Sequence, residues 1–248
     1  MDTSNVIELK NVSIYHAREG AGKVSHGSKR LRGGELVLSD INLSVGRGEL
    51  VYLIGKVGSG KSTLLRTLYG EIPLLAGEGR VAGYDLRGLR RKDVPHLRRR
   101  LGIVFQDCQL LTDRNVLGNL HYVMKATGWK NDADIRRRAE EVLNMVGLTN
   151  KEHKMPFELS GGEQQRLAVA RALVNKPEVI LADEPTGNLD PAAAEAVMNI
   201  FISIARNGCA VVMSTHNVGL IEENPARTLR FLQGRMEEID VRSMLGIE

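Results

Sequence analysis

The sequence predicts an α/β fold with a mainly parallel core sheet. Short apolar runs, such as 179–182 and 209–213, have the length of buried strands, and segments with helical spacing of apolar residues alternate with them. A glycine-rich segment at 55–62 lies between one such strand and a helix. With 248 residues, of which 42% are hydrophobic, the chain is long enough for one large domain, with or without an inserted subdomain.

The glycine-rich segment reads GKVGSGKS and has the spacing G-x-x-x-x-G-K-S. It follows the apolar strand 49–54 and precedes the helix 63–69, which is the context of a phosphate-binding loop. Glycines let backbone N–H groups surround an anion, and the helix N-terminus adds about half a positive charge. We therefore predict that Lys61 reaches the β- and γ-phosphates of a nucleotide and that the Ser62 hydroxyl binds Mg²⁺. An ordinary glycine-rich turn is the alternative.

The segments before this loop predict two strands and a connection. Residues 6–15 alternate as a strand that ends at Tyr15, whose ring either packs on the sheet or forms a platform for a nucleobase. Residues 16–36 are rich in glycine, lysine and arginine and lack apolar periodicity, so we expect a mobile basic loop there. Residues 37–45 predict the next strand.

The middle of the chain predicts short strands and a helical insert. Residues 79–84 are typical of an edge strand, and the apolar strand 101–105 leads directly into Gln106. Residues 87–100 are dense in arginine and lysine, which indicates a solvated helix face; beside anionic headgroups, each charge would add roughly 1 kcal/mol of attraction. From about 115 to 158 the apolar residues follow helical spacing.

An acidic pair, Asp183 and Glu184, directly follows the apolar strand 179–182. Ligands bind at the carboxyl ends of strands in open α/β sheets, so this pair is expected near the phosphate-binding loop. Asp183 is then placed to hold Mg²⁺, and Glu184 to orient or deprotonate an attacking water. The alternative is a pair that caps a helix or faces solvent. Pro191 opens the next helix, and the strand 209–213 precedes His216.

Composition excludes several classes of protein. Two cysteines, Cys108 and Cys209, cannot form a disulfide framework or a four-ligand zinc site, and this usage is typical of a reducing cytosol. No apolar run approaches 18 residues, so we expect no membrane-spanning helix, and residues 1–5 lack the pattern of a signal peptide. A net charge of +4 is too small to argue for nucleic acid or membrane binding.

Two later motifs, LSGGEQQR at 159–166 and LADEPTGNLD at 181–190, complete a familiar order with the phosphate-binding loop, Gln106 and His216. From about residue 6 to 239 the chain resembles the nucleotide-binding domain of ABC ATPases. The resemblance implies a P-loop NTPase fold with an antiparallel β subdomain and an inserted α-helical subdomain at about 107–160, all within one ATP-binding domain spanning 1–248.

The resemblance also implies roles for single residues. Tyr15 would stack on adenine, Gln106 would bridge Mg²⁺ and the γ-phosphate, Asp190 would belong to the D-loop, and His216 would contact the γ-phosphate. Expected catalytic residues are Glu184, His216 and Gln106, and expected metal ligands are Ser62, Gln106 and Asp183. Expected ATP-binding residues are Tyr15, Gly55, Lys56, Val57, Gly58, Ser59, Gly60, Lys61, Ser62, Thr63, Ser160, Gly161, Gly162, Glu163 and Asp190.

The signature at 160–163 has a physical logic of its own. Ser160 and Glu163 have the S-x-x-E spacing of a capping box ahead of a helix over about 162–174, and a helix N-terminus is an anion site. Because the phosphate-binding loop already has its own helix, this second anion site indicates a second nucleotide. In ABC ATPases two protomers meet head to tail and each signature closes on the other's ATP. The resemblance therefore implies a homodimer or a closely related pair.

Residues 105–120 (FQDCQLLTDRNVLGNL) are similar to the FtsE branch of this family. That branch implies an ATPase at the cytoplasmic face of the plasma membrane, bound peripherally through an integral FtsX-like subunit and acting in cell division. An ATPase subunit of LolD or MacB type, for lipoprotein release or efflux, is the same-fold alternative. A nucleic-acid-linked ABC ATPase is a further one, but the chain has no long coiled coil, no second cassette and no zinc-binding cysteine set.

Overall fold

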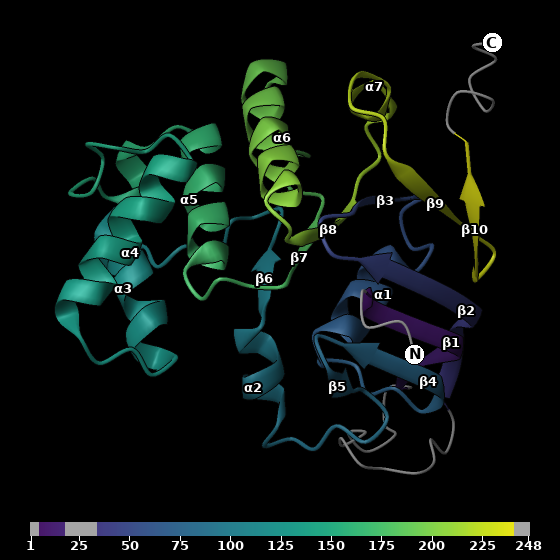
Figure 1. Cartoon of the computed structure of the whole chain (residues 1–248). Helices are drawn as coiled ribbons and strands as arrows, with labels where there is room; N and C mark the ends of the chain where they lie inside the picture. Colours follow the sequence, from purple (N-terminus) through teal and green to yellow (C-terminus); the bar gives the residue numbers. More distant parts are fainter. Residues whose placement is uncertain (1–4, 18–33, 241–248) are drawn as a thin grey trace.

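The computed structural model describes residues 5–17 and 34–240, which form two β-sheets and the helices around them (Figure 1). The larger sheet has six strands in the order β10-β9-β3-β8-β7-β6. From β9 to β6 the neighbours pair in parallel, and β10 runs antiparallel to β9, which confirms the mainly parallel core. The strands are β3 (Leu50–Ile54), β6 (Leu101–Val104), β7 (Val179–Asp183), β8 (Ala210–Ser214), β9 (Arg227–Leu232) and β10 (Arg235–Ile239).

The central strands of the larger sheet, β3, β7 and β8, are buried on both faces. Successive side chains of a strand point to opposite sides, so each of these strands contributes to two cores. In β3, Tyr52 and Ile54 join a hydrophobic core that extends to the helices between residues 116 and 221. Val51 and Leu53, on the opposite face, join a second core beneath α1 (Lys61–Leu68). Continuous apolar strands such as β8 follow from this double burial, which confirms the sequence interpretation of these runs.

The smaller sheet is antiparallel, with four strands in the order β2-β1-β4-β5: β1 (Asn5–Ala17), β2 (Gly34–Gly46), β4 (Ala76–Val81) and β5 (Tyr84–Asp85). β1 continues past Tyr15, and His16 pairs with Glu35. The predicted loop over 16–36 is therefore wrong at both ends, because ladder hydrogen bonds extend the strands through polar residues. The rest of that prediction, 18–33, lies outside the described residues.

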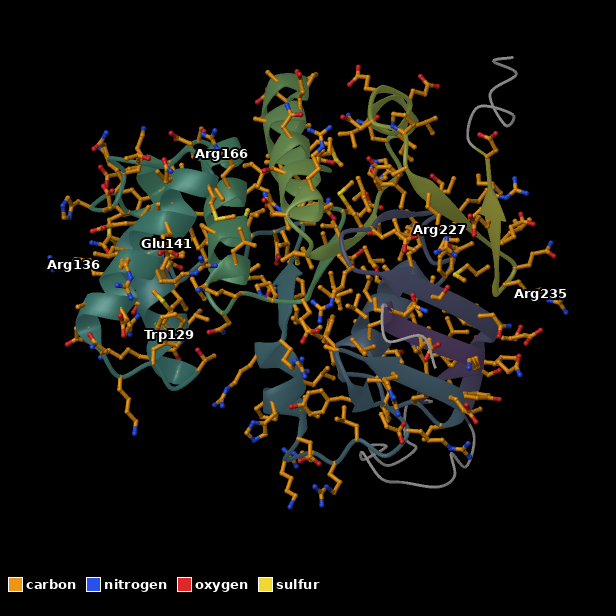
Figure 2. The ribbon with its side chains drawn as sticks, viewed as in Figure 1. Trp129, Arg136, Glu141, Arg166, Arg227 and Arg235 are labelled. Carbon is orange, nitrogen blue, oxygen red and sulfur yellow. The ribbon has the colours of Figure 1, made fainter. Side chains whose placement is uncertain are left out.

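Arg227 joins the two sheets (Figure 2). Its Nη1 donates to Ser44 O of β2 at 2.6 Å and to Glu49 Oε1 at 2.9 Å, and its Nε donates to Glu238 Oε2 of β10 at 3.0 Å. One guanidinium thus connects β2, the start of β3 and the β9–β10 hairpin, which a planar fork of donors allows.

The basic segment 87–100 is not a uniform solvated helix face as predicted. Its helix, α2, spans Val94–Arg99. Arg98 Nε donates to Tyr69 O at 3.0 Å and its guanidinium lies over the Tyr69 ring, while Arg100 forms an ion pair with Glu178. Arg98 thus holds α2 against Tyr69, and Arg100 holds the start of β6 against Glu178. The high density of charged residues in this segment did not indicate such contacts.

A group of helices stands beside the larger sheet: α3 (Val116–Ala126), α4 (Asp132–Met145), a 3₁₀ turn (Pro156–Glu158) and α5 (Gly161–Leu173) (Figure 1). α5 packs closely on β6, since a Cβ at Gly102 would lie 2.8 Å from Ala172 O. Just after α5, Asn175 Oδ1 accepts hydrogen bonds from Trp129 Nε1 and Thr127 Oγ1, both at 3.0 Å (Figure 2 labels Trp129).

Polar side chains cap the helices at their N-termini. Asn115 caps α3, Asn131 caps α4, Asp190 caps α6 (Pro191–Arg206) and Asn217 caps α7 (Val218–Glu223). α5 begins with the predicted Ser160–Glu163 capping box, which is confirmed. Within the described residues, no helix combines the length and the apolar composition needed to cross a membrane.

Candidate functional site

A cavity of about 910 Å³ opens where the glycine-rich loop meets the carboxyl ends of β6 and β7. It gathers segments far apart in the sequence: the β1–β2 hairpin, the glycine-rich loop, the residues after β6 and β7, and His216 after β8. Its lining residues are His16, Glu35, Leu36, Val37, Val57, Gly58, Ser59, Gly60, Lys61, Ser62, Thr63, Phe105, Gln106, Asp107, Asp183, Glu184, Asn188 and His216.

The glycine-rich loop needs its glycines. Gly55, Gly58 and Gly60 have φ of +144°, +81° and +107°, a region that favours glycine. A Cβ at Gly60 would also lie 2.5 Å from Leu38 Cδ2, so the loop is packed against β2. Gly60 is the N-cap of α1, and the first N–H groups of that helix are therefore at the cavity wall. This combination of turned backbone and helix N-terminus suits an anion.

Lys61 is 7% exposed and lies across the loop. Its Nζ donates to Gly55 O at 2.8 Å and to Lys56 O at 3.3 Å, which fixes the ammonium beside the cavity. Among the described residues, Gly55 and Lys56 are not part of the cavity lining, although both were predicted to bind nucleotide. Their backbone carbonyls hold Lys61 instead, so the contribution they make to the site is indirect.

A buried serine connects the two acidic residues. Ser214 Oγ, at the end of β8, donates to Asp183 Oδ1 at 2.6 Å and accepts from Glu184 N at 2.9 Å. Asp183 and Ser214 are neighbours because β7 and β8 pair in register at these residues. A hydrogen bond to a carboxylate is stronger than a neutral one and orients the acceptor. The sequence analysis did not identify Ser214; the signal available was a serine at the polar end of an apolar strand.

Glu184 is held in an unusual conformation. Its φ of +48° lies in the left-handed region, which costs a residue other than glycine about 1–3 kcal/mol and is concentrated at functional sites. Its Oε2 lies 2.8 Å from His216 Nδ1. The predicted base and the predicted γ-phosphate contact are thus hydrogen-bonded partners at one side of the cavity.

Gln106 and Asn188 lie side by side in the cavity wall. Gln106 Nε2 donates to Asn188 Oδ1 at 3.1 Å, which turns the amide oxygen of Gln106 away from Asn188. Ser62, Gln106 and Asp183, the predicted metal ligands, all line the cavity. Oxygen donors of this kind are those that Mg²⁺ prefers. Among the described residues there is no group of three or more His, Cys, Asp or Glu suited to a metal.

His16, rather than Tyr15, is the aromatic residue of β1 that reaches the cavity. His16 lines it and its Nε2 lies 3.2 Å from Thr63 Oγ1, whereas Tyr15 is not among the lining residues of the described chain. Adjacent strand residues point to opposite faces, so Tyr15 and His16 of β1 face different sides of the sheet. The adenine contact of Tyr15 stays a prediction.

The sequence analysis also missed part of the cavity wall. Glu35 and Leu36 were predicted to lie in a loop and Val37 to begin the next strand; all three belong to β2 and line the cavity. Leu36 is 51% exposed. The missed residues after strands, Asp107 and Asn188, lie beside predicted ones.

The signature residues, Ser160, Gly161, Gly162 and Glu163, and Asp190 are not part of the cavity lining of the described chain. The capping box holds the start of α5: Ser160 N donates to Glu163 Oε2 at 2.9 Å. This bond, together with Lys151 at 3.0 Å, lowers the pKa of Glu163. Asp190 accepts from Ala193 N at 3.0 Å.

The N-termini of α5 and α6 lie side by side. A Cβ at Gly162 would be 2.8 Å from Ala193 Cβ, and one at Gly161 would be 3.9 Å from Leu189 Cδ2. The signature therefore lies against Leu189 and Ala193 at the start of α6, close in sequence to Asn188 of the cavity lining.

Fold and cavity together define a nucleotide-binding cassette, and comparison with known proteins gives the same result. The sequence profile of the ABC transporter family matches residues 38–187. The chain belongs to the ABC transporter family of ATPases, and its activity is ATP binding and hydrolysis.

Its relatives include several cell division ATP-binding proteins named FtsE. The protein of Streptococcus pneumoniae strain R6 is 41% identical over 237 residues, which cover 96% of this chain and 100% of that relative. The protein of Mycobacterium tuberculosis is 43% identical, covering 85% of this chain and 91% of the relative. The protein of Escherichia coli K12 is 42% identical, covering 86% and 96%.

Solved structures share the fold. cbiO1 from Clostridium perfringens, part of the ABC transporter complex cbiONQ, superposes with a TM-score of 0.83 at 24% identity, covering 98% of this chain and 91% of that one. An ATP-binding cassette solved as a dimer in a post-hydrolysis state, bound to ADP and Pi, gives 0.78 at 30% identity, covering 95% and 99%. The predicted fold class is confirmed.

Ser214 provides a test of the site's internal bonding. We expect Ser214→Ala to lower the free energy of unfolding by about 1–3 kcal/mol, because a buried bond to a carboxylate is lost. It should also lower kcat about 10- to 100-fold, because Asp183 and Glu184 lose their common partner. Urea unfolding and phosphate release measure the two effects. Ser203→Ala, which removes an exposed hydroxyl from α6, is the control; equal effects of both variants would contradict this account of Ser214.

Proposed function

We propose that the chain is the ATP-hydrolysing subunit of an FtsE-like complex, in which ATP-driven dimerisation acts on an FtsX-like membrane subunit in cell division. The observation that carries this proposal is the similarity to FtsE proteins over nearly the whole length of both chains. The cavity supports the ATPase part of the proposal, since it combines an anion-binding loop, a lysine and an acidic pair.

In the proposed reaction, the N–H groups of residues 57–63 and the Lys61 ammonium bind the phosphates of ATP, while the carbonyls of Gly55 and Lys56 hold that ammonium. Glu184 accepts a proton from the attacking water, and His216, hydrogen-bonded to it, contacts the γ-phosphate. Ser214 keeps Asp183 and the Glu184 backbone in place. Of these groups, Lys61, Asp183, Glu184 and His216 line one cavity, and the buried Ser214 lies behind them.

Mg²⁺ is the cofactor that fits the oxygen donors at this place. We assign it to the Ser62 hydroxyl, the Asp183 carboxylate and the Gln106 amide oxygen, with phosphate oxygens completing the set. When bound, it neutralises charge that develops on the transferred phosphoryl group.

We assign the adenine contact to His16 in place of Tyr15. An imidazole ring can stack on a base, and His16 is the aromatic residue of β1 at the cavity. The exposed Leu36, also in the lining, gives the base an apolar neighbour.

The site is proposed to be completed by a second copy. Ser160, Gly161, Gly162 and Glu163 head a capped helix, which suits an anion, but they are not part of this chain's own cavity lining. The signature of one protomer would therefore close on the ATP of its partner, with Asp190 and its neighbours on the same surface. We keep the assignment of 107–160 as an inserted helical subdomain within a single domain over 1–248 as part of this proposal.

The membrane subunit would hold the ATPase at the cytoplasmic face of the plasma membrane as a peripheral protein. An ATPase subunit of LolD or MacB type remains the alternative, and the identity of the membrane subunit distinguishes the two.

Glu184→Gln tests the reaction and the dimer together. The variant should retain ATP binding but lose about 100-fold or more of its turnover, because the amide cannot accept the proton. With hydrolysis blocked, it should elute as a dimer on gel filtration in ATP and as a smaller species without nucleotide. A variant that stays monomeric in ATP and turns over normally would contradict both assignments.

The adenine contact is tested by a matched pair of neighbours. His16→Ala should weaken ATP binding by about 1–3 kcal/mol, the range for loss of base stacking, whereas Tyr15→Ala should leave affinity near that of the parent. His16→Tyr should restore it. Calorimetry with ATP measures all three. If Tyr15→Ala binds ATP more weakly than His16→Ala, the adenine contact belongs to Tyr15 instead.

Copurification tests the partner. The full-length chain, captured from native membranes in mild detergent, should bring with it an FtsX-like protein with few transmembrane helices, identified by mass spectrometry. Capture of a lipoprotein-release or efflux apparatus would favour the alternative. The Lys61→Ala variant serves as a comparison, because weaker nucleotide binding should change the yield of a complex that depends on ATP.

A further inference from the structure

Residues 105–109, here called the glutamine loop, follow β6 and contain Gln106. The loop has a strained backbone: Cys108 and Gln109 are consecutive and have φ of +57° and +47°. Side chains other than glycine rarely adopt this left-handed region, and two in succession persist only when neighbouring groups hold them there. The loop is therefore held by its surroundings rather than by its own preference.

Two side chains of α5 bond this loop from outside the cavity. Gln165, which is 1% exposed, donates from Nε2 to Phe105 O at 3.1 Å and accepts from Cys108 Sγ at 2.7 Å. Arg171 donates from Nη1 to Gln109 O at 2.5 Å and from Nη2 to Cys108 O at 2.8 Å. The four bonds flank Gln106 on both sides and include both residues of left-handed backbone.

The chemistry of these bonds is directional. The Cys108 thiol is a donor, and its Sγ lies 2.7 Å from Gln165 Oε1. The side-chain carbonyl oxygen of Gln165 accepts this hydrogen bond, and its amide N–H donates to Phe105 O. An apolar side chain at residue 165 would leave both partners without their bond, at a buried place where that is costly.

We propose that Gln165 and Arg171 are positioning residues that hold the glutamine loop, and with it Gln106, against α5. The proposal rests on the function proposed for Gln106 at the metal and γ-phosphate. It adds that α5 controls where Gln106 lies. Because α5 begins at the signature and Arg171 is about 15 Å along the helix from Gly161, one rigid element joins the signature of one site to Gln106 of the other.

The test uses Gln165→Met and Arg171→Met in the full-length chain with Mg²⁺ and ATP. Both should lower kcat about tenfold or more, since a small displacement of a catalytic group has effects of this size, while the Kd for ATP measured in EDTA stays close to that of the parent. Any cooperativity in the ATP dependence of turnover should weaken, because the link between signature and Gln106 is loosened. Cys108→Ser, which keeps a donor for Gln165, should retain kcat.

Arg138→Met is the matched control. Arg138 also donates to two backbone carbonyls of the α5 end, Leu173 O at 2.6 Å and Val174 O at 3.1 Å, but neither carbonyl belongs to the glutamine loop. Its loss should lower the thermal unfolding midpoint and leave kcat unchanged. A fall in kcat equal to that of Arg171→Met, at the same loss of stability, would overturn the positioning role.

Double variants decide whether the effect passes through Gln106. In a Gln106→Ala background, Gln165→Met should lower kcat no further, because the group it positions is gone. Multiplicative losses would overturn the inference. If Gln106→Ala alone leaves kcat unchanged, the role proposed for Gln106 fails and this inference with it. If Gln106→Ala lowers kcat but Gln165→Met and Arg171→Met do not, only this inference fails. Should Gln165→Met not fold, Arg171→Lys, which loses the paired donors, gives the same reading.

Discussion

The central strands of the larger sheet are buried on both faces, so polar side chains are accommodated only at the ends of these strands. β3, β7 and β8 are apolar through most of their length, and their polar residues come at the carboxyl end or directly after it. Because these strands are parallel and in register, the polar ends fall at one edge. The glycine-rich loop, the acidic pair and His216 meet there for this reason, without any segment having to fold back over the sheet.

Backbone strain also occurs at this edge of the sheet. Glu184, Cys108 and Gln109 all have positive φ although none is glycine, and each follows a strand at a point where the chain must turn sharply. Ser214 bonds the Glu184 N–H, and α5 bonds the backbone of Cys108 and Gln109. Hydrogen bonds from β8 and α5 thus hold the strained backbone in place. A site whose loops are held by rigid strands and helices keeps its catalytic groups in a precise geometry.

Much of this arrangement was predictable, because the strongest signals are local. The loop spacing, the capping box at Ser160 and the acidic pair after β7 each need few residues, and their roles follow from chemistry and strand polarity. The true ends of β1 and β2 were harder to predict. Ladder hydrogen bonds extend both strands through polar residues that carry no apolar pattern, so the sequence indicated a loop where His16 and Glu35 pair.

Contacts between distant segments were beyond prediction from one sequence. Nothing near Arg98 in the sequence indicates Tyr69, and nothing near Gln165 indicates Phe105. These partners are brought together by the packing of α2 and α5, which depends on the whole fold. The many charged residues at 87–100 therefore predicted a solvent-exposed face, whereas Arg98 and Arg100 form specific contacts with other segments.

Trp129 is the one tryptophan of the sequence, and its indole N–H shares the Asn175 oxygen with Thr127. The fluorescence of the native protein that is excited beyond the tyrosine band therefore comes from one place, where the turn between α3 and α4 meets the residues just after α5. A change in how those helices sit against α5 would alter the hydration of this indole and shift its emission, so the chain has an internal optical reporter of helix movement that requires no label.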